Sequence, residues 1–259
     1  PHGSMLPTSP VRKNIFMVAF PLGLLIPVVI IFMRENMNTR VRGRKDLENV
    51  TVPFIGEIPL FTRKKKGIFG KKPQEVKAVV VKEGSRDIIN EAFRVLRTNL
   101  EFMTGKDKTS NVIIVTSFNP GSGKSFLTMN IAVSFAIKGK KVLVIDGDLR
   151  HGSASSYIDS PTKGLSDYLG GRIDNLNEII VTNPKQKYLD ILPVGTIPPN
   201  PTELLFDDRL KQVIDTVREQ YEYVLIDCPP IELVADTQII EKLADRTIFV
   251  VRAGLLELS

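Results

Sequence analysis

The sequence predicts an α/β protein with a doubly wound, mainly parallel sheet, preceded by one transmembrane helix. Three observations point to this fold class. From residue 111 onward, short apolar segments alternate with helical ones, which is typical of a parallel sheet covered by helices on both faces. A glycine-rich segment follows the first of these apolar segments. Near the start of the chain, twenty uncharged and mostly apolar residues stand together.

The first predicted element is a membrane span over Asn14–Met33, inside a transmembrane segment assigned to residues 6–34. A helix needs about 20 residues to cross the hydrocarbon core, which this stretch supplies. It is also longer than the apolar region of a signal peptide, and its prolines are tolerated in a membrane. A buried core helix is the alternative. Residues 1–5 (PHGSM) are interpreted as the remnant of an expression tag.

Positive charge is concentrated on both sides of the span and mostly after it. Residues 1–82 hold 15 of the 35 Lys and Arg but only 5 of the 29 Asp and Glu. The positive-inside rule therefore places the C-terminal side in the cytoplasm. Residues 35–77 are predicted to be a basic juxtamembrane linker, either a solvated tether or a contact for anionic lipid headgroups. Because the rest of the chain is mildly acidic, a nucleic-acid-binding domain is not expected.

The globular domain is expected over residues 78–259. It begins with a helix over Ser85–Phe102, whose apolar residues repeat at helical spacing. Five apolar segments then read as buried strands, and four segments between them read as helices. The predicted strands are Asn111–Thr116, Lys141–Ile145, Tyr188–Leu192, Tyr223–Ile226 and Thr247–Val251, and the predicted helices are Ser125–Ile137, Leu165–Leu169, Leu204–Glu219 and Ala235–Ala244.

Residues 117–125 read SFNPGSGKS and are predicted to bind the phosphates of a nucleotide. Backbone N–H groups of such a loop point at phosphate oxygens, Lys124 adds a positive charge, and the Ser125 hydroxyl can hold Mg²⁺. Phe118 replaces the usual first glycine, but the strand before and the helix after supply the required context. A structural glycine-rich turn is the alternative. The predicted nucleotide-binding residues are Asn119, Pro120, Gly121, Ser122, Gly123, Lys124, Ser125 and Phe126.

Acidic residues follow two of the predicted strands. Asp146 and Asp148 come directly after the second strand, and Asp227 follows the fourth. Ligands of such sheets bind beyond the carboxyl ends of the strands, so these carboxylates are expected to converge on the loop. There they can hold the metal that bridges the β and γ phosphates, or its waters. Helix capping is the alternative, and Arg150 is interpreted as a salt-bridge partner.

Several segments in order along the chain resemble one protein family. SFNPGSGKS, VLVIDGDLR and YEYVLIDCPP resemble the Walker A, A′ and B motifs of the bacterial tyrosine kinases, which are membrane-bound regulators of exopolysaccharide and capsule synthesis. EAFRVLRTN (residues 91–99) resembles the oligomerisation helix of that family. KGLSDYLGG, VGTIPPNPTELL and LENVTVPFIGEIP resemble further family segments. The family's tyrosine-rich tail has no counterpart here, so the kinase domain is expected to be incomplete at its C-terminus.

The resemblance implies a P-loop NTPase-like fold and a protein-tyrosine autokinase that uses ATP and Mg²⁺. It implies that Lys124 stabilises charge on the phosphates and that Ser125 and Asp227 organise the metal. Asp148 would contact the ligands or waters of the metal without binding the metal directly, and Asp146 would orient or deprotonate the attacking tyrosine. The predicted catalytic residues are Lys124, Asp146, Asp148 and Asp227, and the predicted metal-site residues are Ser125, Asp148 and Asp227.

The resemblance also implies a location in the bacterial inner membrane, with the catalytic domain in the cytoplasm. The expected partners are membrane lipid, the polysaccharide polymerisation and export machinery, and an opposing tyrosine phosphatase. Self-association is expected through a helix row formed by Glu91, Arg94 and Arg97. An intrachain salt bridge on a solvated face is the alternative for these charges.

Two other functions stay open. A P-loop ATPase switch of the partitioning type shares the Walker architecture, although it usually carries a lysine where Asn119 stands here. The second alternative is a non-catalytic membrane scaffold that binds nucleotide and controls polysaccharide chain length.

Overall fold

A computed structural model of the chain describes residues 12–36, 41–47, 50–60, 78–104, 111–231 and 236–256. The interpreted tag remnant, residues 1–5, lies outside the described residues. So do residues 61–77, which contain most of the lysines of the predicted basic linker.

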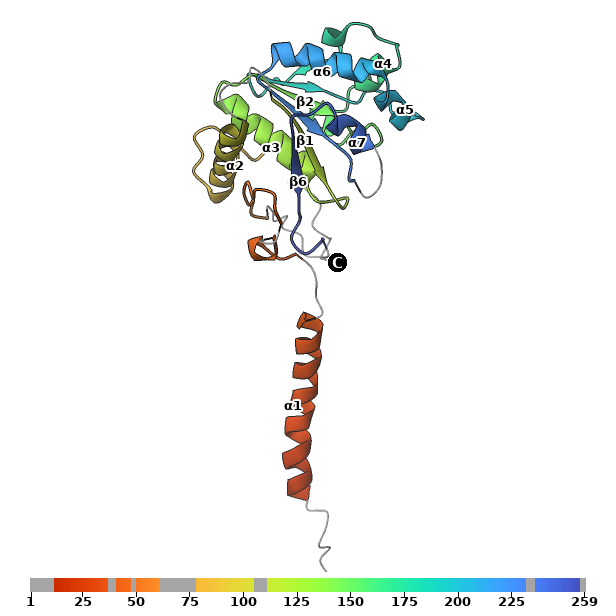
Figure 1. Cartoon of the computed structure of the whole chain (residues 1–259). Helices are drawn as coiled ribbons and strands as arrows, with labels where there is room; N and C mark the ends of the chain where they lie inside the picture. The colour runs from red at the N-terminus through yellow and green to blue at the C-terminus, as the bar shows by residue number, and fades with distance from the viewer. Residues whose placement is uncertain are drawn as a thin grey trace, which may run out of the picture.

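The predicted span is a single helix, α1 (Arg12–Asn36), which stands apart from the sheet domain in Figure 1. Its apolar window, Ile15–Arg34, has a mean hydropathy of 2.8, and none of that window is buried inside the structure. A core helix of a soluble protein would be mostly covered. By length and composition, α1 is therefore suited to cross a membrane.

A mainly parallel sheet of six strands forms the centre of the domain, in the order β3-β4-β2-β5-β1-β6. The five predicted strands are present, each within a few residues of its expected bounds. A sixth, β3, pairs antiparallel with β4 at the edge of the sheet. It was not predicted because it has only two residues. The strands are β1 (Asn111–Ser117), β2 (Val142–Asp146), β3 (Val181–Thr182), β4 (Leu189–Leu192), β5 (Tyr223–Asp227) and β6 (Arg246–Val250).

Helices cover both faces of this sheet, as the doubly wound class requires (Figure 1). On one side lie α2 (Ile88–Thr104) and α3 (Lys124–Ile137). On the other lie α4 (Leu165–Leu169), α5 (Pro201–Leu205), α6 (Asp208–Gln220) and α7 (Asp236–Glu241). Short 3₁₀ helices occupy Arg44–Leu47, Ser155–Ile158 and Leu176–Glu178.

The expected helix over Leu204–Glu219 is two helices, α5 and α6. Asp207 separates them because its backbone is extended and its side chain caps the second helix, accepting a hydrogen bond of 2.8 Å from the Arg209 amide. An N-cap residue has non-helical backbone angles, so the chain turns at this point. Apolar periodicity alone could not show this break.

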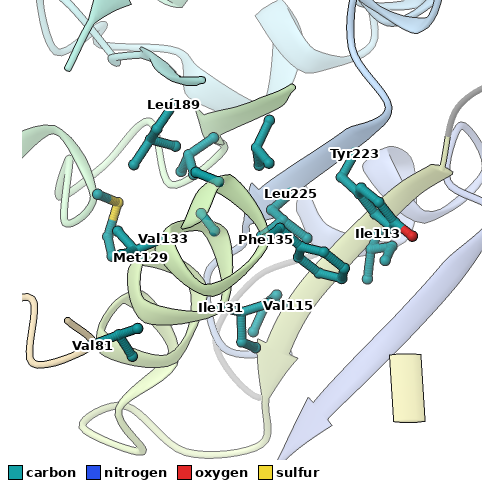
Figure 2. Close-up of a cluster of buried hydrophobic side chains, with 14 of the residues drawn as sticks. Val81, Ile113, Val115, Met129, Ile131, Val133, Phe135, Leu189, Tyr223 and Leu225 are labelled. Atoms are coloured by element: carbon teal, nitrogen blue, oxygen red, sulfur yellow. The ribbon is translucent and has the colours of Figure 1, made fainter. Parts of the chain in front are cut away.

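Two hydrophobic clusters fill the layers between sheet and helices. Successive residues of β1 alternate between them: Ile113 and Val115 pack toward α3, while Val112 and Ile114 pack toward α6. Figure 2 shows the α3 side, where Phe135 stacks on Tyr223 with ring centroids 4.0 Å apart. The sheet is therefore buried on both faces, and its carboxyl edge is where polar side chains collect.

Part of the segment between α1 and the domain packs against the domain. Val41 is buried, and it exchanges backbone hydrogen bonds of 2.9 Å with Leu256 and 2.7 Å with Gly254. Farther on, the Ile55 carbonyl accepts a hydrogen bond of 2.8 Å from the Asn99 side chain of α2. These contacts attach residues of the predicted linker to both ends of the described domain.

Candidate active site

A phosphate-sized loop joins the end of β1 to the start of α3. Gly121 and Gly123 in this loop have φ angles of 72° and 90°, in the left-handed region that favours glycine. Gly123 is the N-cap of α3, so the amides of Lys124 and Ser125 are among the first of the helix and lack intrahelical acceptors. The positive end of a helix dipole with exposed N–H groups suits an anion such as a phosphate.

Three side chains donate hydrogen bonds to carbonyl oxygens of this loop. The Asn119 carbonyl accepts 2.8 Å hydrogen bonds from the hydroxyls of both Ser117 and Ser122. The Gly121 carbonyl accepts one from the Arg252 guanidinium, which follows β6. Two carbonyls of the loop are therefore engaged by side chains in the unliganded chain, which supports this loop shape.

Asp146 and Asp227 lie side by side at the carboxyl edge of the sheet. They are register partners on the adjacent parallel strands β2 and β5, and both side chains are buried. Gly147 joins the two strand ends, because its amide donates a 2.9 Å hydrogen bond to the Asp227 carbonyl. Asp146 and Asp227 therefore lie next to each other at this edge, and the expected convergence of Asp146, Asp148 and Asp227 on the loop stays a prediction.

Three carboxylate oxygens of this pair accept no hydrogen bond of normal geometry from the described residues, although the Ser125 hydroxyl is close enough to Asp227 to lower its pKa. They are Oδ1 of Asp146 and both oxygens of Asp227. The other oxygen of Asp146, Oδ2, accepts hydrogen bonds from Ser155. A buried carboxylate oxygen without a donor is costly unless a cation or a proton accompanies it. The pair is therefore suited to hold a cation beside the loop.

The electrostatics of the pair agree with this arrangement. Burial raises the pKa of Asp227 to about 8, the charge of Asp146 adds to the rise, and the Ser125 hydroxyl and Lys124 ammonium offset part of it. Burial also raises the pKa of Asp146 to about 6, against the opposing hydrogen bonds from Ser155. A divalent cation at the pair would favour the ionised form of both carboxylates.

Asp148 is also buried but is engaged within its own loop. Its Oδ1 accepts hydrogen bonds of 3.2 Å from the amides of Arg150 and His151, and its Oδ2 lies 3.1 Å from Nδ1 of His151. These contacts close a turn in the loop after β2; because no helix begins at Asp148, they are not the helix cap of the alternative. A role for Asp148 around the metal stays a prediction.

Arg150 forms the expected salt bridge. Its Nε lies 3.1 Å from Oδ2 of the buried Asp236, and its NH2 donates a 2.9 Å hydrogen bond to the Thr202 hydroxyl. Thr202 in turn donates to Oδ1 of Asp236 at 2.7 Å. This network ties the loop after β2 to α5 and α7. Sequence reasoning gave neither residue a role: Asp236 lies in no quoted motif, and Thr202 lies in VGTIPPNPTELL, which was noted only as a resemblance.

No group of three or more His, Cys, Asp or Glu in the described part of the chain could hold a metal by itself. Mg²⁺ commonly binds through one or two carboxylates together with waters and the phosphates of a nucleotide. The unpartnered oxygens of Asp227, with Ser125 nearby, therefore fit a Mg²⁺ that arrives with a nucleotide.

The predicted self-association row on α2 needs a correction. Glu91 and Arg94 form an intrahelical salt bridge of 2.6 Å, and both side chains are half-exposed. Arg97, however, is buried, and its NH1 donates hydrogen bonds to the carbonyl and hydroxyl oxygens of Ser134 at 2.9 and 3.1 Å. The prediction that Arg97 extends the exposed row is wrong, because this side of α2 packs on α3.

Comparisons with known proteins bear on both fold and site. Residues 110–256 match the sequence profile of the AAA domain family. Tyrosine-protein kinase etk of Escherichia coli strain K12 is 32% identical over 261 aligned residues, covering 96% of this chain and 35% of that protein. Tyrosine-protein kinase YwqD of Bacillus subtilis strain 168 is 37% identical over 180 residues, covering 69% of this chain and 75% of that protein.

The chain spans about a third of the length of the first curated relatives that it matches. Among solved structures, the kinase domain of Escherichia coli tyrosine kinase ETK has a TM-score of 0.71 at 30% identity, with 83% of each chain covered. The chimerical protein CapA2B2 has a TM-score of 0.67 at 31% identity, with 80% of this chain and 84% of that chain covered.

Proposed function

The chain belongs to the bacterial tyrosine kinase family, and from this premise we propose that it is a protein-tyrosine autokinase. It transfers the γ-phosphoryl group of ATP to tyrosine hydroxyls and thereby regulates the polymerisation and export of exopolysaccharide or capsule. The main support is the buried Asp146–Asp227 pair, with its unpartnered oxygens, at the edge of the sheet that carries the phosphate-sized loop.

Residues 119–126 hold the triphosphate in this proposal. The first amides of α3 and the Lys124 ammonium face its negative charge, which grows on the transferred group during the reaction. Ser125 and Asp227 would hold Mg²⁺, and Asp148 would act on the waters around the metal. When bound, Mg²⁺ neutralises charge on the β and γ phosphates.

Asp146 orients and deprotonates the tyrosine. As the phenol oxygen attacks the γ-phosphorus, its proton passes to Oδ1 of Asp146. The bond from the γ-phosphorus to the β,γ-bridging oxygen breaks, and ADP leaves with the electron pair. In the unliganded chain burial raises the pKa of Asp146, and a cation bound at Asp227 would keep the Asp146 carboxylate ionised and able to accept the proton.

The proposed location is the bacterial inner membrane, with α1 across the bilayer and the catalytic domain in the cytoplasm. The apolar length of α1 and the excess of basic residues that follow it support this orientation. Anionic lipid, the polysaccharide polymerisation and export machinery and an opposing tyrosine phosphatase are the proposed partners.

Self-association through α2 is part of the proposal. Besides Glu91 and Arg94, this helix exposes three large apolar side chains at seven-residue spacing, which places them along one side: Ile88, Val95 and Phe102. Exposed apolar side chains in a row, next to charged ones, suit contact with another protein surface.

We expect the double variant Glu91→Ala with Arg94→Ala to shift the chain toward smaller assemblies and to lower phosphotyrosine yield. Light scattering in detergent gives the mass, and phosphotyrosine detection gives the yield. The matched control is Glu83→Ala with Arg86→Ala, which removes one charge of each sign just before α2. Unchanged mass and yield in the first variant would remove α2 from the assembly surface.

The function is tested by following the labelled γ-phosphate of ATP. The chain, in detergent or lipid vesicles with Mg²⁺ and a synthetic glutamate–tyrosine copolymer, should move label onto tyrosine. Label released only as free phosphate would indicate an ATPase switch instead. Nucleotide binding with neither transfer nor hydrolysis would indicate a non-catalytic scaffold.

A further inference from the structure

Ser155 contacts the Asp146 carboxylate through two separate donors. After β2 ends at Asp146, the chain makes a loop and returns at Ser155, the first residue of a 3₁₀ helix. The Ser155 amide donates to Oδ2 of Asp146 at 2.6 Å, and its hydroxyl donates to the same oxygen at 2.7 Å. Both side chains are buried. The return of this loop therefore places two donors on one oxygen.

A third segment fixes the direction of the Ser155 hydroxyl. The amide of Val194, in the loop after β4, donates to the Ser155 oxygen at 2.9 Å. Since the hydroxyl accepts from Val194, its own hydrogen is directed to Asp146. Val194 is buried as well, so water does not compete for these groups. A short chain of hydrogen bonds thus runs from the loop after β4 to the end of β2.

We propose that Ser155 is a positioning residue for the phosphoryl transfer: it fixes Oδ2 of Asp146, so that Oδ1, which is buried and accepts no hydrogen bond of normal geometry in the unliganded chain, is the oxygen left to receive the proton. This inference rests on the proposed function, because it assigns the orientation of the group that receives the tyrosine proton. Nothing in the nucleotide-binding motifs points to Ser155, which lies nine residues beyond Asp146.

The physical reason is the freedom of a carboxylate. The terminal torsion of an aspartate is broad and two-fold, so without fixed donors its oxygens can exchange places or turn away from the reaction. Two donors on Oδ2 hold the plane of the group, and charge-assisted hydrogen bonds are the strong ones. A general base must lie within hydrogen-bond reach of its proton, so small rotations lower the rate without weakening nucleotide binding.

The test compares Ser155→Ala with Ser166→Ala. Ser166 is an equally buried serine, and it donates to the Thr196 carbonyl rather than to the site. Each variant loses one buried hydroxyl, but Ser155→Ala also leaves the Val194 amide without its acceptor, so the melting temperatures of both variants are measured to separate stability from catalysis. We expect Ser155→Ala to lower kcat roughly ten-fold or more, as loss of a hydrogen bond to a charged group does. Its KM for ATP and its affinity for a non-hydrolysable ATP analogue should change less than about three-fold.

Both transfer to the glutamate–tyrosine copolymer and release of free phosphate are measured, at a temperature where circular dichroism shows the variants folded. If the wild type only hydrolyses ATP, the kinase proposal fails, yet the Ser155 comparison can still be made on hydrolysis. If Ser155→Ala does not fold, Ser155→Cys takes its place, because a thiol fills the site with only a weak donor. A kcat equal to that of Ser166→Ala, or a parallel loss of nucleotide affinity, would overturn the assignment.

Discussion

Lys124→Met is expected to lower the rate of tyrosine phosphorylation by at least ~10²-fold while the fold is retained, since a preorganised charge at a transferring phosphoryl group is commonly worth ~10²–10³ in rate. Lys124 is the first residue of α3 and adjoins Gly123 of the phosphate-sized loop. Methionine keeps most of the side-chain length but removes the charge. The rate is measured as label transferred from γ-labelled ATP, and folding by circular dichroism.

Lys138→Met is the matched control. It removes the same charge at the opposite end of the same helix, where Lys138 is the exposed C-cap. It should leave the rate within about two-fold of wild type, since exposed surface charges contribute little. If Lys124→Met phosphorylates tyrosine at the rate of the control, Lys124 has no part in the transfer.

Asp227→Asn is expected to have two opposite effects. With Mg²⁺ and ATP present, it should weaken magnesium-dependent nucleotide binding, because the unpartnered oxygens of Asp227 are those that fit the cation. Without metal or nucleotide, the same variant should be more stable than wild type at high pH. Nucleotide binding is measured by calorimetry at several Mg²⁺ concentrations, and stability by thermal unfolding in a chelator.

The sign of the stability effect follows from the raised pKa. An aspartate titrates near 3.8 in the unfolded chain, whereas the pKa of Asp227 in the folded chain is about 8. Between these values the folded state binds more protons, so the free energy of unfolding falls as pH rises toward 8. Asparagine does not titrate and lacks this loss. The difference in free energy of unfolding between the variant and wild type should shift by at least ~1 kcal/mol in favour of the variant from pH 5 to pH 8. For a domain of this size that is about 2–4 °C in melting temperature.

Asp215→Asn serves as the control for this comparison, because Asp215 is exposed on α6. The pH dependence of its melting temperature relative to wild type is the baseline that is subtracted from that of Asp227→Asn. If the melting-temperature difference between Asp227→Asn and wild type is the same at pH 5 and pH 8, Asp227 is already ionised at pH 5 and its pKa is not raised. Unchanged magnesium dependence would independently remove Asp227 from the metal site.

The sequence predicts the sheet well where burial is continuous. Apolar runs such as those of β1 and β5 are buried at every position, so composition alone marks them. The two-residue strand β3 and the cap at Asp207 depend on local backbone angles that apolar spacing does not report. Arg97 shows a different limit. Its partner Ser134 is on another helix, and only the packing of α2 on α3 reveals that this arginine points inward.

Some site residues could be predicted from the chain order, and others depend on loop paths and packing. Asp146 and Asp227 end two strands and Lys124 follows a third, and the carboxyl ends of these strands share one edge, so the chain order alone predicts that they lie at the same edge. Ser155 could not be found, because its role depends on the path of a loop back to β2. Asp236 and Thr202 meet Arg150 only through the packing of α5 and α7.

The most direct test of the central claim is a crystal structure of the chain with a non-hydrolysable ATP analogue and Mn²⁺, whose anomalous scattering locates the metal. We expect the β and γ phosphates to lie on the amides around Gly121 to Ser125. The Mn²⁺ peak should lie at about 2.1–2.2 Å from the Ser125 hydroxyl oxygen, near usual Mg²⁺–oxygen distances. The Asp227 carboxylate should hold the ion directly or through one water, with Oδ1 of Asp146 turned toward the γ-phosphate. A nucleotide bound away from this loop, or a metal peak remote from both Ser125 and Asp227, would contradict the account.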